Sequence, residues 1–99
     1  MTQTDKTGAP TTVTAESEQY TIAVEGHNVG KAEFLDRGAQ RVFTHTEVDS
    51  EYEGRGLATI LIGEALKETR EAGKRIVPKC QMVAAYLKKH DEYSDIVDN

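Results

Sequence analysis

The chain has 99 residues, a net charge of -5 and 37% hydrophobic residues, which predicts a single domain with a modest core. The negative charge argues against general nucleic-acid binding, which needs a basic surface. It suits attraction of a cationic acceptor such as an amine, although solubility alone is the commoner reason for acidity. Because no long apolar run or secretory signal is present, we expect a cytoplasmic protein that does not bind membranes. The single cysteine, Cys80, excludes an intramolecular disulfide and a Cys-rich metal site, and no metal is expected.

The first half of the chain is expected to contain a tail followed by strands. Residues 1–18 are polar and rich in threonine, which predicts a disordered N-terminal tail ahead of a folded domain over residues 19–99. Period-two alternation then predicts three antiparallel strands, with turn residues between them, at residues 20–24, 31–35 and 41–48. Strict alternation along the third strand would place on one face Val42, Thr44, Thr46 and Val48. The opposite face would carry Phe43, His45 and Glu47.

The second half is expected to be mainly helical. Apolar residues at helical spacing predict an amphipathic helix over residues 56–72, ended by Gly73. Gly63 inside it costs about 1 kcal/mol relative to alanine, which a close helix–sheet contact would explain. Residues 74–77 predict a fourth strand, and the right-handed crossover makes it a parallel neighbour of the third. A second helix after Cys80 is indicated by Val83, Tyr86, Leu87 and His90. The predicted fold class is α/β with a mixed sheet: three antiparallel strands, a crossover helix, a parallel fourth strand and a C-terminal helix.

A Gly-X-Gly turn lies between the third strand and the first helix. Gly54 and Gly56 let the backbone adopt dihedrals barred to other residues. The N–H groups of residues 55–59 would then be unpaired donors at the positive end of a helix, where a phosphate binds well. Arg55 could add charge-assisted hydrogen bonds. A plain tight turn is the alternative, because the pattern is neither a Walker P-loop nor a full Rossmann fingerprint. The turn therefore suggests a phosphate-bearing ligand, such as a coenzyme.

Two further residues suggest chemistry. Cys80 lies next to a helix N-terminus, which can activate a thiol, or it is a buried structural cysteine. His45 suits proton transfer near neutrality, with Glu47 on the same face to orient it, or it is an ordinary strand histidine. If the third and fourth strands are adjacent, the cysteine and the histidine could meet at one end of the sheet as nucleophile and base. A phenol such as that of Tyr86 could act as a general acid, although core packing is its commoner role.

These motifs together resemble the Gcn5-related N-acetyltransferases. The resemblance spans about residues 20–97 and is narrowest to the minimal, YjdJ-type subfamily that includes N-acetyltransferase domain-containing protein 1. The segments that carry it are residues 45–48, 52–58, Pro78 with Cys80, 83–86, and His90 with Tyr93. It implies an enzyme that moves an acetyl group from acetyl-CoA, as co-substrate, to a primary amine of a protein lysine, a peptide or a small polyamine.

The resemblance also implies where the coenzyme binds. The diphosphate would contact the turn and the helix start, namely Gly54, Arg55, Gly56, Leu57, Ala58 and Thr59. The pantetheine arm would run along Glu47 and Val48, which brings the thioester near Cys80 and His45. Glu53 replaces the Gln or Arg usual in the family, and we expect it to point away, because a carboxylate beside a diphosphate is unfavourable. Met82 stands where Phe is more usual, which should affect local packing.

Catalysis would rest on two residues with open alternatives. His45 would be the general base, and Cys80 would either become acetylated or only position the acetyl group. The acceptor side should be open, because few residues join the first two strands whereas larger relatives carry extra helices there. That favours a bulky acceptor or a groove completed by another subunit, in a monomer or weak homodimer. Two other functions stay in view: a module that binds CoA or acetyl-CoA with little catalysis, and a thiol protein that senses oxidants through Cys80.

Overall fold

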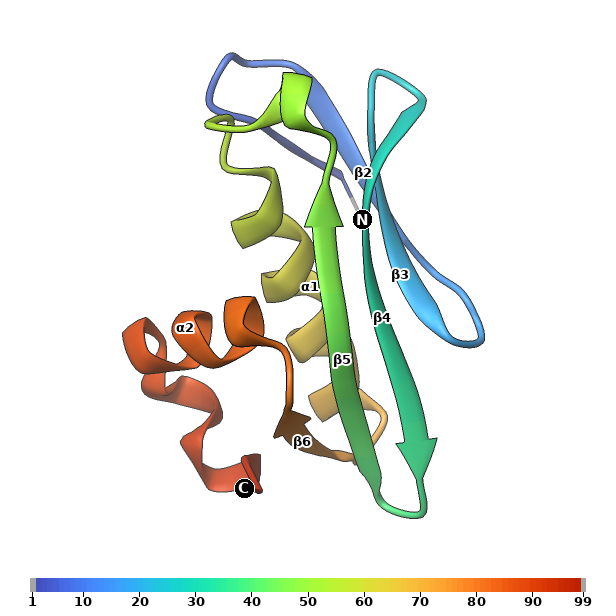
Figure 1. Ribbon diagram of the computed structural model, residues 1–99, viewed down its shortest axis with the longest axis vertical. Coiled ribbons are helices and arrows are strands. Elements are labelled where there is room, and N and C mark those ends of the chain that lie inside the picture. The colour runs from blue at the N-terminus through green and yellow to red at the C-terminus, as the bar shows by residue number, and fades with distance from the viewer. Residues whose placement is uncertain (1, 99) are drawn as a thin grey trace.

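The computed structural model describes residues 2–98 and has one six-stranded sheet, in the order β1-β2-β3-β4-β5-β6, with two α-helices (Figure 1). The strands are β1 (Thr2–Thr4), β2 (Pro10–Ala15), β3 (Gln19–Val24), β4 (His27–Arg37), β5 (Gln40–Val48) and β6 (Arg75–Pro78). The helices are α1 (Leu57–Glu71) and α2 (Gln81–Lys89), with short 3-10 turns η1 (Ser50–Tyr52) and η2 (Asp91–Ile96). Within residues 2–98, neither helix has the length and apolar character needed to cross a membrane.

The strands and the crossover helix follow in the expected order. Strands β3, β4 and β5 are antiparallel neighbours, α1 crosses over, and β6 pairs with β5 in parallel. Glu25 and Gly26 join β3 to β4 with φ values of 51° and 83°, a conformation that suits a two-residue hairpin turn. The predicted fold class is therefore confirmed.

The expected disordered tail is wrong for the residues that the structure describes, whereas Met1 lies outside them. Residues 2–15 form an antiparallel hairpin, β1–β2, whose second strand pairs with β3 from Thr11↔Val24 to Ala15↔Tyr20. Thr11 is only 1% exposed. The polar, threonine-rich composition of this segment suggested disorder, yet threonine is β-branched and favours strands. Pairing with β3 satisfies the backbone hydrogen bonds of β2, and the composition of the segment did not reveal this pairing.

One face of the sheet carries the core, and both helices lie on that side (Figure 1). The core is built from both layers, including Tyr20, Ile22, Phe34, Phe43, Leu57, Leu61, Leu66 and Val83. Its position corrects the faces expected for β5. The register shifts between the pairs Glu33↔His45 and Phe34↔Phe43, so Thr44 is an extra residue that reverses the alternation. Consequently Phe43 and Thr46 are both buried, whereas His45 is exposed on the uncovered face.

Gly63 is explained by a helix–helix contact and not by the expected helix–sheet contact. A Cβ atom added at Gly63 would lie 3.0 Å from the Tyr86 hydroxyl oxygen. The ring of Tyr86, from α2, therefore occupies the space above this glycine. Gly63 lets the two helices approach closely, which offsets its low helix propensity.

Candidate functional site

Strands β5 and β6, at one end of the strand order, part about halfway along β5. They pair from Gln40↔Arg75 to Phe43↔Pro78, after which β6 ends and the chain enters α2. The Cys80 N–H donates to the Phe43 carbonyl oxygen at 2.9 Å and closes the paired region. Strand β5 continues to Val48, so its last residues have no parallel neighbour. The edge of β5 there offers backbone donors and acceptors to a ligand.

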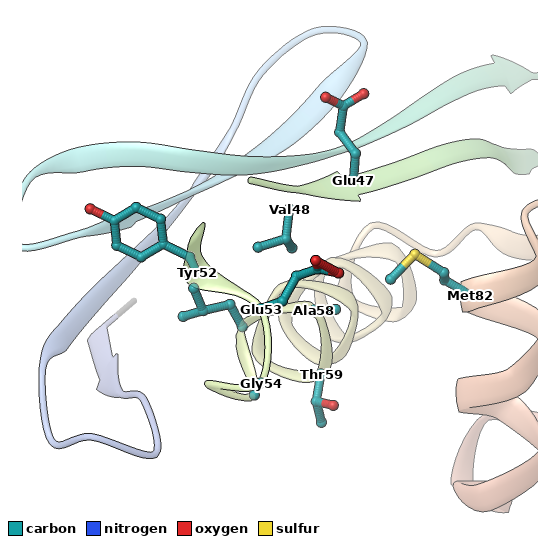
Figure 2. Close-up of a pocket in the computed structure, with 10 residues that line it drawn as sticks. Glu47, Val48, Tyr52, Glu53, Gly54, Ala58, Thr59 and Met82 are labelled. Carbon is teal, nitrogen blue, oxygen red and sulfur yellow. The ribbon is translucent and has the colours of Figure 1, made fainter. Parts of the chain in front are cut away.

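A groove of about 420 Å³ opens beside this edge and runs to the N-terminus of α1 (Figure 2). It is lined by Glu47, Val48, Tyr52, Glu53, Gly54, Gly56, Leu57, Ala58, Thr59 and Met82. Every residue expected to contact the coenzyme therefore lines the groove, with the exception of Arg55. Its walls come from the end of β5, the loop after it, the first turn of α1 and the first turn of α2.

The N-terminus of α1 presents bare backbone donors to the groove. Gly54 and Gly56 have φ values of 80° and 79°, in the left-handed region that glycine tolerates best. The first intrahelical bond is donated by the Ile60 N–H to the Gly56 carbonyl at 3.2 Å. The N–H groups of residues 57–59 precede that bond, and no side chain caps the helix. Together with the positive end of the helix dipole, these groups have the character that an anion-binding site requires.

Arg55 points away from the groove. Its Nε and Nη2 atoms lie 2.8 Å and 2.7 Å from Asp5 Oδ2, and its guanidinium stacks on the Tyr52 ring at 4.9 Å from the centroid. The guanidinium is thus bound to the β1–β2 hairpin. In this conformation it does not supply the phosphate contact expected from the sequence.

Two further residues of the groove were not assigned to it from the sequence, and a third is placed differently. Glu53 lines the groove, whereas it was expected to point away. It is the extended residue that ends η1, with φ -67° and ψ 154°. Tyr52 and Met82 complete the lining. Tyr52 belongs to a segment that carried the family resemblance, and Met82 lies in the first turn of α2, two residues after Cys80. Their closeness in sequence to these motifs was the signal that could have assigned them to the groove.

Cys80 and His45 do not meet. Cys80 is 8% exposed, and its Sγ donates to Thr46 Oγ1 at 3.4 Å, on the core side of β5. Successive strand residues alternate between faces, and His45 accordingly lies on the opposite face, where its side chain is 55% exposed. His45 Nε2 lies 2.8 Å from Glu47 Oε1. The expected histidine–glutamate pair is therefore present, whereas the cysteine–histidine pair is not.

A second hollow of about 240 Å³ adjoins the groove between the two helices and shares Ala58, Thr59 and Met82 with it. Tyr86 lines this hollow and stacks on His90, with ring centroids 4.0 Å apart. Burial raises the pKa of the Tyr86 phenol above its ordinary value of 10.0. The phenol therefore stays protonated at neutral pH and can donate a hydrogen bond.

Comparisons with known proteins agree with this architecture. The sequence model of the family described as GCN5-related N-acetyl-transferase matches residues 19–96, whereas no curated protein matches the chain. A solution structure of a GCN5-like candidate N-acetyltransferase from Staphylococcus aureus is similar, with a TM-score of 0.69, 20% identity and coverage of 89% of this chain and 88% of that one.

A crystal structure of an aminoglycoside acetyltransferase from an uncultured soil metagenomic sample, in complex with sisomicin, has a TM-score of 0.53 and 16% identity. The match covers 77% of this chain and 56% of the aminoglycoside acetyltransferase chain. At these identities both likenesses concern the fold, and membership rests on the family match over most of the chain. The chain belongs to the GCN5-related N-acetyltransferase family and is an acetyl-transferring enzyme.

Proposed function

We propose that the protein transfers the acetyl group of acetyl-CoA to a primary amine of a protein lysine, a peptide or a small polyamine. The observation that carries the proposal is the single groove that joins the bare N-terminus of α1 to the unpaired edge of β5. A diphosphate needs backbone donors and a positive helix end, and a pantetheine amide needs a strand edge. Both features line one continuous surface here.

The coenzyme is assigned to the groove residue by residue. The N–H groups of residues 54–59 hold the diphosphate, with Gly56 allowing close approach of the ligand. The pantetheine arm lies alongside the end of β5, at Glu47 and Val48. The thioester then reaches the point where β5 and β6 part, beside Cys80.

His45 is assigned as the general base. In the reaction the amine nitrogen bonds to the thioester carbonyl carbon, the C–S bond breaks, and CoA leaves as a thiolate. His45 takes the proton that the amine loses, and Glu47, 2.8 Å from its ring, orients the imidazole. The thiolate takes up a proton on release. The exposed ring lies on the sheet face that the helices leave uncovered, so the amine approaches from that side.

Cys80 is assigned a positioning role in a direct attack. Its low exposure and its bond to Thr46 hold the thiol inside the core, as is common for a structural cysteine. The covalent route, with an acetylated cysteine, is the alternative mechanism. A protein that binds the coenzyme with little turnover is the alternative function, because His45 has no contact with Cys80 and stands exposed.

The test combines binding and turnover. Calorimetry with acetyl-CoA should detect binding by the wild type and by His45→Gln alike. Turnover of a lysine peptide or a polyamine should fall about 100-fold or more in His45→Gln, the usual size of a lost general base. His27→Gln, at an exposed histidine on the β3–β4 hairpin, is the matched control and should retain turnover. Binding without turnover on a broad amine panel would favour the binding module, and absence of binding would refute the proposal.

A further inference from the structure

The β1–β2 hairpin lies outside the residues matched by the family, which begin at residue 19, yet it contacts the turn at the start of α1. The loop of the hairpin brings Asp5 to Arg55, fifty positions later in the chain. Further along α1, Gln3 Nε2 donates to Glu64 Oε1 at 2.7 Å. The hairpin is therefore attached to the first two turns of the helix and to the segment before it.

Asp5 is satisfied on both oxygens. Oδ1 accepts bonds from the Thr7 N–H at 2.8 Å, the Thr7 hydroxyl at 2.6 Å and the Ala9 N–H at 3.1 Å. Oδ2 accepts from Arg55 at 2.8 Å and 2.7 Å, and the Asp5 side chain is 0% exposed. Since the hairpin loop fixes the carboxylate from one side, the guanidinium is bound to a rigid anchor.

The anchor acts on the backbone of the turn. Arg55 stands between Gly54 and Gly56, both at positive φ, and because glycine has no Cβ the segment has little conformational restraint of its own. The hairpin restrains Arg55 at three points: the side chain through Asp5 and through the Thr7 hydroxyl, which accepts from Nη2 at 3.3 Å, and the carbonyl oxygen through the Lys6 N–H at 3.0 Å. The Lys6 side chain also covers Gly56, because a Cβ there would lie 3.2 Å from Lys6 Cε. The direction of the neighbouring N–H groups is thereby tied to the hairpin.

We propose that Asp5 is a positioning residue for coenzyme binding: through Arg55 it holds the Gly54–Gly56 turn with its N–H groups directed into the groove. This inference rests on the proposed function, in which that turn binds the diphosphate. Preorganised donors lose less entropy on binding than mobile ones. Removing the anchor should therefore weaken coenzyme binding specifically, without altering the groups that act on the amine.

The experiment compares Asp5→Asn with Asp36→Asn in the full chain. Asp36 is the control because it also pairs with a largely buried arginine, Arg41, at 2.8 Å. Neither Asp36 nor Arg41 lines the groove. Calorimetry with CoA should show the dissociation constant of Asp5→Asn raised by roughly tenfold and that of Asp36→Asn unchanged. In steady-state assays the KM for acetyl-CoA should rise in Asp5→Asn, while kcat and the KM for the amine stay near the wild-type values. A merely structural role would not produce that split.

Three outcomes overturn the inference. Equal CoA affinity of the wild type and Asp5→Asn refutes it and leaves the proposed function intact, and so does an equal loss in Asp36→Asn. Absence of CoA binding by the wild type refutes both. If Asp5→Asn fails to fold, Thr7→Val decides, because it removes the hydroxyl that donates to Asp5 at 2.6 Å and accepts from Arg55 at 3.3 Å, and it keeps the ion pair between Asp5 and Arg55. A smaller rise in the CoA dissociation constant of Thr7→Val supports the positioning role, and an unchanged value rejects it.

Discussion

Cys80 and Thr46 meet where β6 and β5 part, with Cys80 Sγ 3.4 Å from Thr46 Oγ1. Both side chains are buried, at 8% and 6% exposure. The hydroxyl accepts the hydrogen bond that the thiol donates, which fixes the direction of the thiol within the core. The contact joins the two strands just beyond their last paired residues, which is a structural role in its own right.

Replacement of Cys80 by alanine is expected to lower stability more than chemistry. The lost sulfur leaves a small cavity and an unpaired Thr46 hydroxyl, which should reduce the free energy of unfolding by about 1–2 kcal/mol. Urea denaturation measures this, and initial rates should retain most of the wild-type turnover. Intact-protein mass spectrometry after mixing with acetyl-CoA should show no stable acetyl adduct. An adduct in the wild type that disappears in Cys80→Ala, together with loss of turnover, would establish the covalent route instead.

Substitution of Glu53 by glutamine is expected to tighten coenzyme binding. The carboxylate lines the groove that is assigned to the diphosphate, and repulsion between exposed like charges costs up to about 1 kcal/mol, equivalent to a few-fold in affinity. Glu51→Gln, at an exposed glutamate of η1 outside the groove, is the control and should change little. The gain should shrink at high salt, since screening weakens the repulsion. Calorimetry at two ionic strengths measures both effects, and equal affinities at low salt would place the diphosphate elsewhere.

The domain from β3 to α2 was predictable because its signals are local. Period-two alternation identified the strands, the apolar stripe identified α1, and the connection from β5 through α1 imposed the parallel pairing of β6. The position of the groove followed from Gly54 and Gly56, because they mark a turn at the start of a helix, where backbone N–H groups are unpaired. These inferences needed only residues that are close in sequence.

What the sequence did not predict depends on contacts between distant residues. The bond between Asp5 and Arg55 spans fifty positions, and threonine-rich segments such as β2 have no apolar signature. The extra residue at Thr44 in β5 is invisible to an alternating pattern, yet it determines which face His45 occupies. The separation of His45 from Cys80 follows from that single residue.

Gly54→Ala and Gly73→Ala form a matched pair. Both glycines have positive φ, 80° and 73°, and a Cβ at either would meet nothing within 4 Å. Each substitution should therefore cost about 1–2 kcal/mol of stability through backbone strain. Only Gly54 belongs to the proposed diphosphate turn, so only Gly54→Ala should weaken CoA binding in calorimetry. Gly73 lies beyond the C-terminal end of α1. A similar loss of CoA affinity in Gly73→Ala would therefore mean that general destabilisation causes the effect.

The contact between Gly63 and Tyr86 predicts a non-additive pair of substitutions. Gly63→Ala gains about 1 kcal/mol of helix propensity, but its Cβ would meet the Tyr86 hydroxyl at 3.0 Å, so the gain should be cancelled. In the Tyr86→Phe background the nearest remaining ring atom is 3.7 Å away, an ordinary contact. Gly63→Ala should then stabilise the protein, with a coupling energy of about 1 kcal/mol between the two sites. Denaturant unfolding of the four proteins measures the cycle, and strict additivity would contradict the close contact.

Acid should remove the stabilising effect of Asp5 in a defined pH range. The Thr7 hydroxyl, followed by the backbone N–H groups of Thr7 and Ala9 and by Arg55, lowers the pKa of Asp5 from 3.8 to about 2. The unfolded chain therefore binds this proton at a higher pH than the folded chain does. The contribution is complete above a pH of about 4 and is lost as the pH falls toward 2. Because other acidic groups titrate in the same range, the informative quantity is the difference in unfolding free energy between the wild type and Asp5→Asn. Urea unfolding between pH 2 and pH 7 should show a constant difference above pH 4 that shrinks below it. A difference that stays unchanged down to pH 2 would mean that the carboxylate does not stabilise the fold through its charge.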